Sequence, residues 1–155
     1  MQKILVFSDS HGRMEYVKRI LDKENDCKTV FFLGDGMDEV ENVIPLYADR
    51  KFIVVKGNCD FSCSAELYAY KHIEGVTFMA CHGNALSVRY TLRELFNKAH
   101  DVRANVALYG HTHIRNTTFD SYSGVCAVNP GALCDGYYCV IEAENGNYEI
   151  FSKQV

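Results

Sequence analysis

The feature that most constrains this fold is a repeated pattern in which short apolar runs end in clusters of glycine and polar residues. In α/β sheets, ligand sites form outside the carboxyl ends of the strands, so clusters at those ends can converge on one crevice. Glycine lets the backbone turn sharply there. The five clusters are Asp9-Ser10-His11-Gly12, Gly34-Asp35-Gly36, Gly57-Asn58-Cys59-Asp60, His82-Gly83 and Gly110-His111-Thr112-His113.

The spacing of apolar residues predicts the secondary structure. Helical spacing predicts a helix over residues 13–24, and Pro45 limits a second helix to about residues 38–44. Glu74-Gly75 separates two strand-like runs and predicts an antiparallel hairpin. A third helix is expected at 91–99, and strands at 3–8, 29–33, 51–55, 67–73, 76–81, 106–109, 115–120, 125–128, 137–142 and 148–151. This order predicts one α/β domain over residues 1–155, with two packed sheets covered by helices.

Composition narrows the classes of function. The 155 residues are 48% hydrophobic, which is enough for a packed core, and the formal charge is -4. An acidic chain lacks the basic surface that tracks a nucleic-acid backbone, so polymeric nucleic acid is a poor candidate substrate. No apolar stretch approaches the ~20 residues that span a bilayer and no leader is visible, so we expect a cytoplasmic protein without membrane partners.

The clusters carry the donor atoms of a transition-metal site. Residues two apart on an extended segment point to the same side, so Asp9 and His11 are expected to face inward together. The residues His111 and His113 repeat this spacing. Mg²⁺ and Ca²⁺ sites use oxygen ligands, whereas a mixture of carboxylate, imidazole and amide suits Mn²⁺, Zn²⁺, Fe or Ni²⁺. The candidate ligands are Asp9, His11, Asp35, Asn58, His82, His111 and His113.

Taken in order, these motifs resemble those of the calcineurin-like metallophosphoesterase superfamily, in particular its small prokaryotic phosphodiesterase branch. They are DSH at 9–11, GDGMD at 34–38, GNCD at 57–60, HG at 82–83 and GHTH at 110–113, and the resemblance runs from residue 4 to about residue 142. It implies a four-layer α/β/β/α sandwich of two mixed β-sheets flanked by helices. It also implies a hydrolase that cleaves phosphate esters, expected to be small phosphodiesters, with a hydroxide that bridges two metal ions.

The same resemblance implies a role for each candidate ligand. Asp35 would bridge two divalent transition-metal ions, with manganese expected first and zinc, iron or nickel as alternatives. The candidate catalytic residues are Asp35, Asn58 and His82. One ion would be held by Asp9, His11 and His113, and the other by Asn58, His82 and His111.

The chain departs from the family pattern in its third motif. Cys59 stands where many members have a histidine, which is the usual candidate for protonating the leaving group. Asp38, which would orient that histidine, then has no partner. A second departure is Ala132, where the related branch commonly has serine.

Residues near the motifs are candidates for substrate contacts. Arg13 and Cys59 are expected to bind substrate, with Asp60 as a further contact and Tyr90 or Tyr137 as stacking surfaces. The histidines outside the clusters, His72 and His100, are expected to be structural.

A non-catalytic alternative exists on the same fold. The superfamily's fold also occurs in a scaffold subunit of an endosomal sorting complex, and scaffolds of that kind can keep part of the metal site. All seven ligand positions are filled here with competent residues, which favours an enzyme. An exposed apolar patch of several hundred Å² would favour the scaffold. The sequence leaves the oligomeric state open, a homo-oligomer included.

Overall fold

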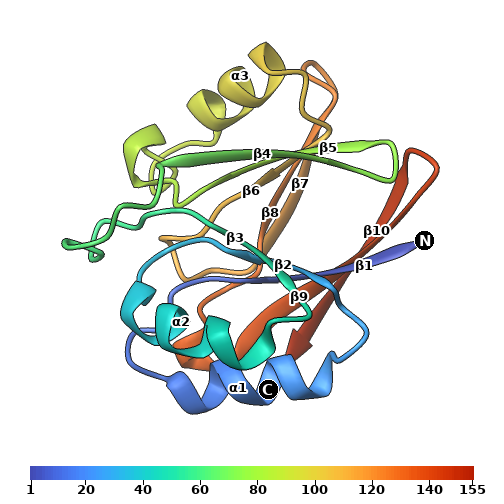
Figure 1. Cartoon of the computed structure of the whole chain (residues 1–155). Helices are drawn as coiled ribbons and strands as arrows, with labels where there is room; N and C mark the ends of the chain where they lie inside the picture. The colour runs from blue at the N-terminus through green and yellow to red at the C-terminus, as the bar shows by residue number, and fades with distance from the viewer.

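The computed structural model describes residues 1–155 and contains two five-stranded mixed sheets (Figure 1). The first sheet has the strand order β10-β9-β1-β2-β3 and the second β4-β5-β6-β8-β7. The first is built from β1 (Gln2–Phe7), β2 (Thr29–Phe32), β3 (Lys51–Val54), β9 (Tyr137–Glu144) and β10 (Asn147–Gln154). The second is built from β4 (Tyr68–Ile73), β5 (Val76–Cys81), β6 (Val106–Leu108), β7 (Asn116–Asp120) and β8 (Val125–Asn129).

Helices cover the outer face of each sheet. The helices α1 (Met14–Lys23) and α2 (Met37–Val43) lie on the first sheet, and α3 (Arg93–Asp101) lies on the second (Figure 1). The strands alternate between two cores, since Ile4 of β1 packs between the sheets whereas Leu5 packs beneath the helices. The four-layer α/β/β/α expectation is therefore confirmed.

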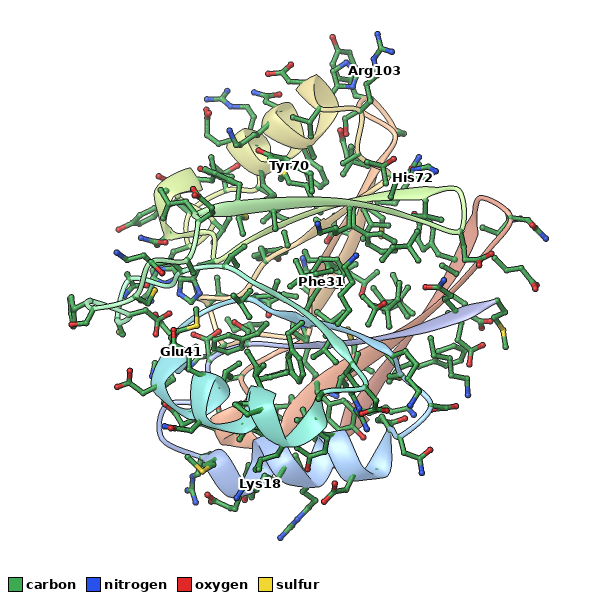
Figure 2. All side chains as sticks on the ribbon, viewed as in Figure 1. Lys18, Phe31, Glu41, Tyr70, His72 and Arg103 are labelled. Atoms are coloured by element: carbon green, nitrogen blue, oxygen red, sulfur yellow. The ribbon has the colours of Figure 1, made fainter.

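The inner core joins the two sheets. Phe31 of β2 lies between them (Figure 2), and its ring centroid is 5.9 Å from that of Phe78 in β5. The central strands β1, β2 and β3 are parallel neighbours, as are β5, β6 and β8. Because parallel strands end at the same edge of a sheet, the polar clusters after β1, β2, β3, β5 and β6 are gathered along one side of the molecule.

The observed elements follow the expected ones with small shifts at their ends. The helix α2 ends at Val43, and Pro45 lies in the 3₁₀ turn Ile44–Tyr47 that follows it. The third helix begins at Arg93 rather than at residue 91. The turn between β4 and β5 has left-handed backbone at Glu74 and Gly75, with φ values of 50° and 81°, as a two-residue hairpin requires.

No helix in the structure combines the length and the apolar character needed to cross a membrane.

Candidate metal centre

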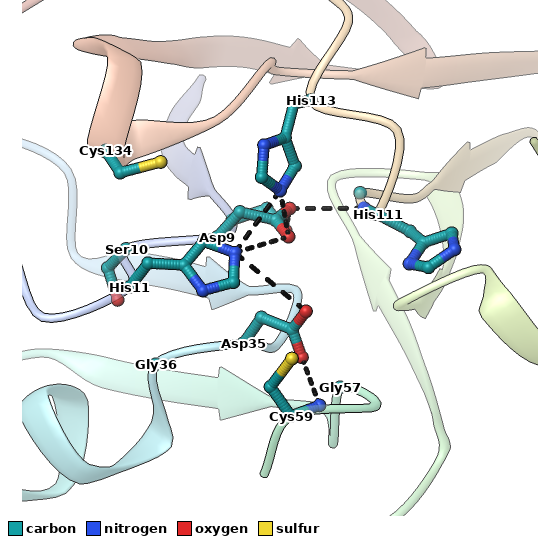
Figure 3. A network of polar contacts seen from close by, with 12 residues as sticks. Asp9, Ser10, His11, Asp35, Gly36, Gly57, Cys59, His111, His113 and Cys134 are labelled. Carbon is teal, nitrogen blue, oxygen red and sulfur yellow. Dashed lines mark hydrogen bonds and ion pairs between the residues drawn. The ribbon is translucent and has the colours of Figure 1, made fainter.

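The first group of donor atoms lies where β1 and β6 end. His113 Nε2 lies 3.1 Å from Asp9 Oδ1, and His11 Nε2 lies 3.5 Å from the same oxygen. The two imidazole nitrogens face each other at 3.2 Å. A hydrogen bond between them uses only one proton, so at least one nitrogen directs a lone pair into this space. Figure 3 shows the three side chains converging on one point, as the ligands of a cation do.

The second group connects the two sheets. The donor atoms of Asp35, His82 and His111 lie within 4.8 Å of one another, and these residues follow β2, β5 and β6. His82 Nδ1 donates a hydrogen bond to the Leu33 carbonyl at 2.7 Å. In a neutral ring, Nε2 then carries the lone pair, which is the tautomer that binds metals.

The Nε2 atom of His82 tests whether a cation fits this group. It is buried and has no hydrogen-bond partner. Asp35 Oδ2 lies 3.2 Å away, but the alignment is not that of a hydrogen bond. Buried polar atoms are rarely left without a partner, because desolvation then goes uncompensated. A cation shared with the neighbouring carboxylate and imidazole would satisfy this nitrogen, so the donor set fits a metal.

Asp35 lies between the two groups. Its Oδ2 atom is 3.2 Å from His82 Nε2 and 4.0 Å from His11 Nε2. Its Oδ1 atom accepts a hydrogen bond from the Cys59 backbone N–H at 2.7 Å (Figure 3). One carboxylate oxygen is therefore fixed by the backbone, and the other faces both histidines.

The electrostatics favour the metal-binding forms of Asp35 and His111, whereas His82 has to release a proton when a metal binds. Burial acts to raise the pKa of Asp35, but His82 and a backbone N–H outweigh it and lower the pKa to about 2. Burial lowers the pKa of His111, and the positive charges of His82 and Arg89 lower it further. For His82 itself, burial acts to lower the pKa, but the Asp35 carboxylate contributes to a net rise. An ionised carboxylate and a neutral imidazole are the states that a metal requires.

The backbone at the site differs from the extended geometry that the two-residue spacing predicted. Five of the seven candidate ligands have left-handed backbone, which is uncommon for residues other than glycine. The side chains converge as expected. The predicted reason was wrong, because tight turns rather than extended segments orient these side chains. The φ values are 55° at Asp9, 40° at His11, 62° at Asp35, 67° at His111 and 62° at His113.

This strain predicts that removing a ligand stabilises the metal-free fold. His113→Gly should raise the free energy of unfolding by about 1 kcal/mol, since ~1 to 3 kcal/mol of strain is relieved and ~0.5 to 1 kcal/mol of backbone entropy is lost. Urea unfolding of metal-free protein measures the change. A matched control is His100→Gly inside α3, which should lose about 1 kcal/mol. Equal losses in both variants would show that residue 113 is not strained.

Asp60 has a role other than the substrate contact expected for it. Its side chain is buried, and its two oxygens accept four backbone hydrogen bonds at 2.8 to 3.0 Å. The donors are the N–H groups of Asp35, Gly36, Met37 and Gly57. The carboxylate therefore clamps the loop after β2 to the loop after β3, and this clamp positions Asp35.

Two glycines allow the loops to approach one another. A Cβ atom at Gly57 would lie 2.1 Å from Asp35 Oδ1, and one at Gly110 would lie 2.1 Å from Ser8 Oγ. Either side chain would force the loop and its ligand apart.

The two residues predicted to bind substrate, Cys59 and Arg13, have different surroundings in the structure. Cys59 is exposed and lines a cavity of about 260 Å³ together with His11, Asp35 and Asp38. The Arg13 guanidinium lies 3.4 Å from Glu15 Oε1 and 5.4 Å from the centroid of the Tyr16 ring. The role of Arg13 as a substrate contact stays a prediction.

The Asn58 amide is exposed and lies 3.5 Å from Cys59 Sγ, so its ligand role stays a prediction.

Three residues near the centre were missed. Glu39 Oε1 accepts hydrogen bonds from Ser10 Oγ and the Gly12 N–H, and so fixes the turn after β1. Asn129 Nδ2 donates to the Gly110 carbonyl at 3.0 Å and so supports the loop after β6. Cys134 Sγ is close to His113, although no motif marked it. None of these contacts could be found from sequence, because each joins segments distant along the chain.

Comparison with known proteins agrees with this geometry. The chain is 28% identical over 130 residues to the "probable metallophosphoesterase YsnB" of Bacillus subtilis, covering 84% of this chain and 74% of that protein. Vps29 of Entamoeba histolytica in complex with Zn²⁺ has a TM-score of 0.78 at 17% identity, covering 99% of this chain and 98% of that chain. An archaeal phosphodiesterase has a TM-score of 0.74 at 21% identity, covering 98% and 100% of the two chains. At such identities the two structures share the fold alone.

The family profile described as "Calcineurin-like phosphoesterase superfamily domain" matches residues 2–146, which include every candidate ligand. The ordered motifs, the two-sheet architecture and this match agree, and the chain belongs to the calcineurin-like phosphoesterase superfamily.

Proposed function

We propose that the protein is a metal-dependent phosphodiesterase with a dinuclear centre at the carboxyl ends of its two sheets. The observation that carries the proposal is the buried His82 Nε2, which lacks a hydrogen-bond partner although Leu33 fixes its ring. A divalent cation would supply that partner. The donors on either side of Asp35 support two ions rather than one.

The residues present suit first-row transition metals. Carboxylate and imidazole donors together fit Mn²⁺, Zn²⁺, Fe or Ni²⁺, and we expect manganese first. Asp35 is assigned to both ions. The remaining assignments are Asp9, His11 and His113 to one ion, and Asn58, His82 and His111 to the other.

The chain's own residues prepare the centre for catalysis. When bound, two divalent ions acidify water and offset the negative charge on phosphate oxygens. In the neutral ring, the Leu33 carbonyl holds the proton on His82 Nδ1 and leaves the lone pair on Nε2, and the Cys59 N–H keeps Asp35 Oδ2 turned toward the histidines. The candidate catalytic residues Asp35, Asn58 and His82 would thus act through the ions.

The charge of the ligands supports a small diester as substrate. Asp9 and Asp35 are the only carboxylates among the proposed ligands, so a centre with two divalent ions keeps a net positive charge. A small positive charge matches the single negative charge of a phosphodiester better than the double negative charge of a phosphomonoester.

The test is to remove metal from the protein, restore each of Mn²⁺, Zn²⁺, Fe²⁺ and Ni²⁺, and assay bis-p-nitrophenyl phosphate and p-nitrophenyl phosphate. Manganese should restore hydrolysis, with kcat/KM higher for the diester. A higher value for the monoester would contradict the diester preference. Bound metal with no hydrolysis of either ester would favour the scaffold alternative.

The cavity beside Cys59 leads to a prediction about leaving groups. General acid catalysis is worth ~10² to 10⁴-fold, and most for poor leaving groups. Cys59→His, with Asp38 in the same cavity to orient the imidazole, should therefore speed hydrolysis of alkyl esters more than that of nitrophenyl esters. A plot of log kcat against leaving-group pKa at saturating manganese should be shallower for the variant. Parallel lines at equal metal content would show that residue 59 does not face the leaving group.

A further inference from the structure

A second cavity, of about 430 Å³, opens beside the candidate metal centre. It lies between the segment that leads into α3 and the loop that follows β6. Its lining includes two arginines, two exposed large hydrophobic side chains and a threonine of the loop after β6. These are Arg89, Arg115, Tyr90, Ile114 and Thr112.

Thr112 connects this cavity to the metal centre. It lies between His111 and His113 in the chain, so one wall of the cavity is the loop that carries two candidate ligands. The Thr112 hydroxyl is held by Asn129 Nδ2 at 3.0 Å and by the Ile114 N–H at 3.2 Å. The wall is therefore fixed relative to the centre.

The cavity is cationic in an acidic chain. Neither Arg89 nor Arg115 forms an ion pair, although the chain carries 20 acidic and 16 basic residues apart from histidine. The Arg115 guanidinium stacks 4.3 Å from the centroid of the Tyr137 ring, which uses its face and leaves its N–H groups free. Planar guanidinium groups without carboxylate partners suit phosphate oxygens.

The apolar part of the lining is unusually exposed. The side chains of Tyr90 and Ile114 are 88% and 68% exposed, and both lie beside the arginines. A free aromatic face next to a cationic groove is the arrangement on which nucleobases stack. The volume is within the range of small-ligand sites and is too small for a long polymer.

We propose that this cavity, the Arg89–Arg115 pocket, holds the part of the substrate beyond the scissile phosphate, and that this part is a nucleoside with a second phosphate, as in a dinucleotide. Tyr90 stacks on the base, and the arginines bind the second phosphate. The inference rests on the proposed phosphodiesterase function and adds its substrate class.

The test compares two esters that differ in one group. They are thymidine 5′-phosphate esterified with p-nitrophenol, and the same ester with a 3′-phosphate. Hydrolysis adds water across the bond from phosphorus to the nitrophenyl oxygen in both, and the released nitrophenol is measured. Charge-assisted hydrogen bonds to the second phosphate should raise kcat/KM of the wild-type, manganese-loaded protein about 10-fold or more, mainly through KM.

Substitutions test whether the pocket causes the preference for the ester that carries a 3′-phosphate. The double substitution Arg89→Gln with Arg115→Gln should bring the ratio of kcat/KM for the two esters close to 1. Arg103→Gln, in the turn that follows α3, should keep the wild-type ratio (Figure 2). Tyr90→Ala should lower kcat/KM for both thymidine esters at least about 5-fold relative to bis-p-nitrophenyl phosphate. Equal rates for the two esters in the wild type, or a preference that survives the double substitution, would overturn the proposal.

Measurements of nucleotide binding test the pocket independently of the proposed phosphodiesterase activity. Calorimetry should show that the metal-loaded protein binds thymidine 3′,5′-bisphosphate about 10-fold tighter than thymidine 5′-phosphate, and that the double variant loses the difference. If no ester is hydrolysed but this difference remains, the phosphodiesterase proposal fails and the pocket stands. If esters are hydrolysed without any such difference, the pocket fails and the phosphodiesterase stands.

Discussion

Asp35→Asn is expected to lower kcat/KM for bis-p-nitrophenyl phosphate by at least about 10³-fold, because loss of a shared ligand removes several kcal/mol of stabilisation from both ions. The same change should reduce bound metal from two ions per chain to one or none. Elemental analysis after manganese reconstitution measures the metal, and initial rates measure the activity.

The hydrogen bonds of Asp35 explain why so small a change has so large an effect. The Cys59 N–H requires an acceptor at Oδ1, so an asparagine at residue 35 must turn its carbonyl oxygen there. Its NH₂ group then takes the place of Oδ2, 3.2 Å from His82 Nε2. An NH₂ group in that position replaces a negatively charged ligand atom and repels a cation. The substitution therefore blocks the second group as well as removing a charge.

The matched control is Asp49→Asn, because Asp49 is exposed and paired with Lys28 away from the centre. It should keep two ions and wild-type activity. Circular dichroism of both metal-free variants should match the wild type, since Asp35 lies at a strand end outside the hydrophobic cores. Two tightly bound ions with full activity in the Asp35 variant would show that this carboxylate does not bridge them.

Much of the fold and of the candidate centre could be predicted from local patterns. Strand alternation and helical spacing report which face of an element is buried, so β1 and α1 were placed within two residues at each end. The polar clusters could be brought together because parallel strands end at a common edge. The approach of Asp9 to His113 across 104 residues was predictable on that ground.

The same patterns could not predict which strands pair or which segments come close together in the fold. Periodicity does not say which sheet a late strand joins, so nothing marked β9 and β10 as members of the sheet of β1 while β7 and β8 join the other sheet. The left-handed backbone at His111 was also missed, because it depends on the close approach of Gly110 to Ser8.

Asp60→Asn is expected to lower the free energy of unfolding by about 3 to 6 kcal/mol. An amide offers one acceptor oxygen, so two of the four backbone N–H groups would face an NH₂ group. Each unsatisfied buried donor costs ~1 to 3 kcal/mol, and the remaining pair loses its charged acceptor. Against a typical total of ~5 to 15 kcal/mol, such a loss should be plain in urea unfolding of the metal-free protein.

The pH dependence provides a second measure of the clamp. Burial acts to raise the pKa of Asp60, but the backbone N–H groups outweigh it and the pKa is lowered. A lowered folded pKa means that the stabilisation is fully present above the unfolded value of about 3.9 and is lost as pH falls through the folded one. The difference in the free energy of unfolding between the wild type and Asp60→Asn should therefore shrink as the pH is lowered.

Metal binding separates this clamp from the substrate contact that the sequence predicted for Asp60. Because the clamp joins the loops of Asp35 and Asn58, its loss should weaken manganese binding about 10 to 100-fold, as the loss of groups that hold metal ligands in place does. Asp49→Asn should change neither stability nor metal affinity by a comparable amount. A contact with substrate would instead raise KM for bis-p-nitrophenyl phosphate and leave the urea midpoint and the metal affinity at wild-type values. That result would show that Asp60 contacts substrate and that its hydrogen bonds to the four backbone N–H groups do not stabilise the fold.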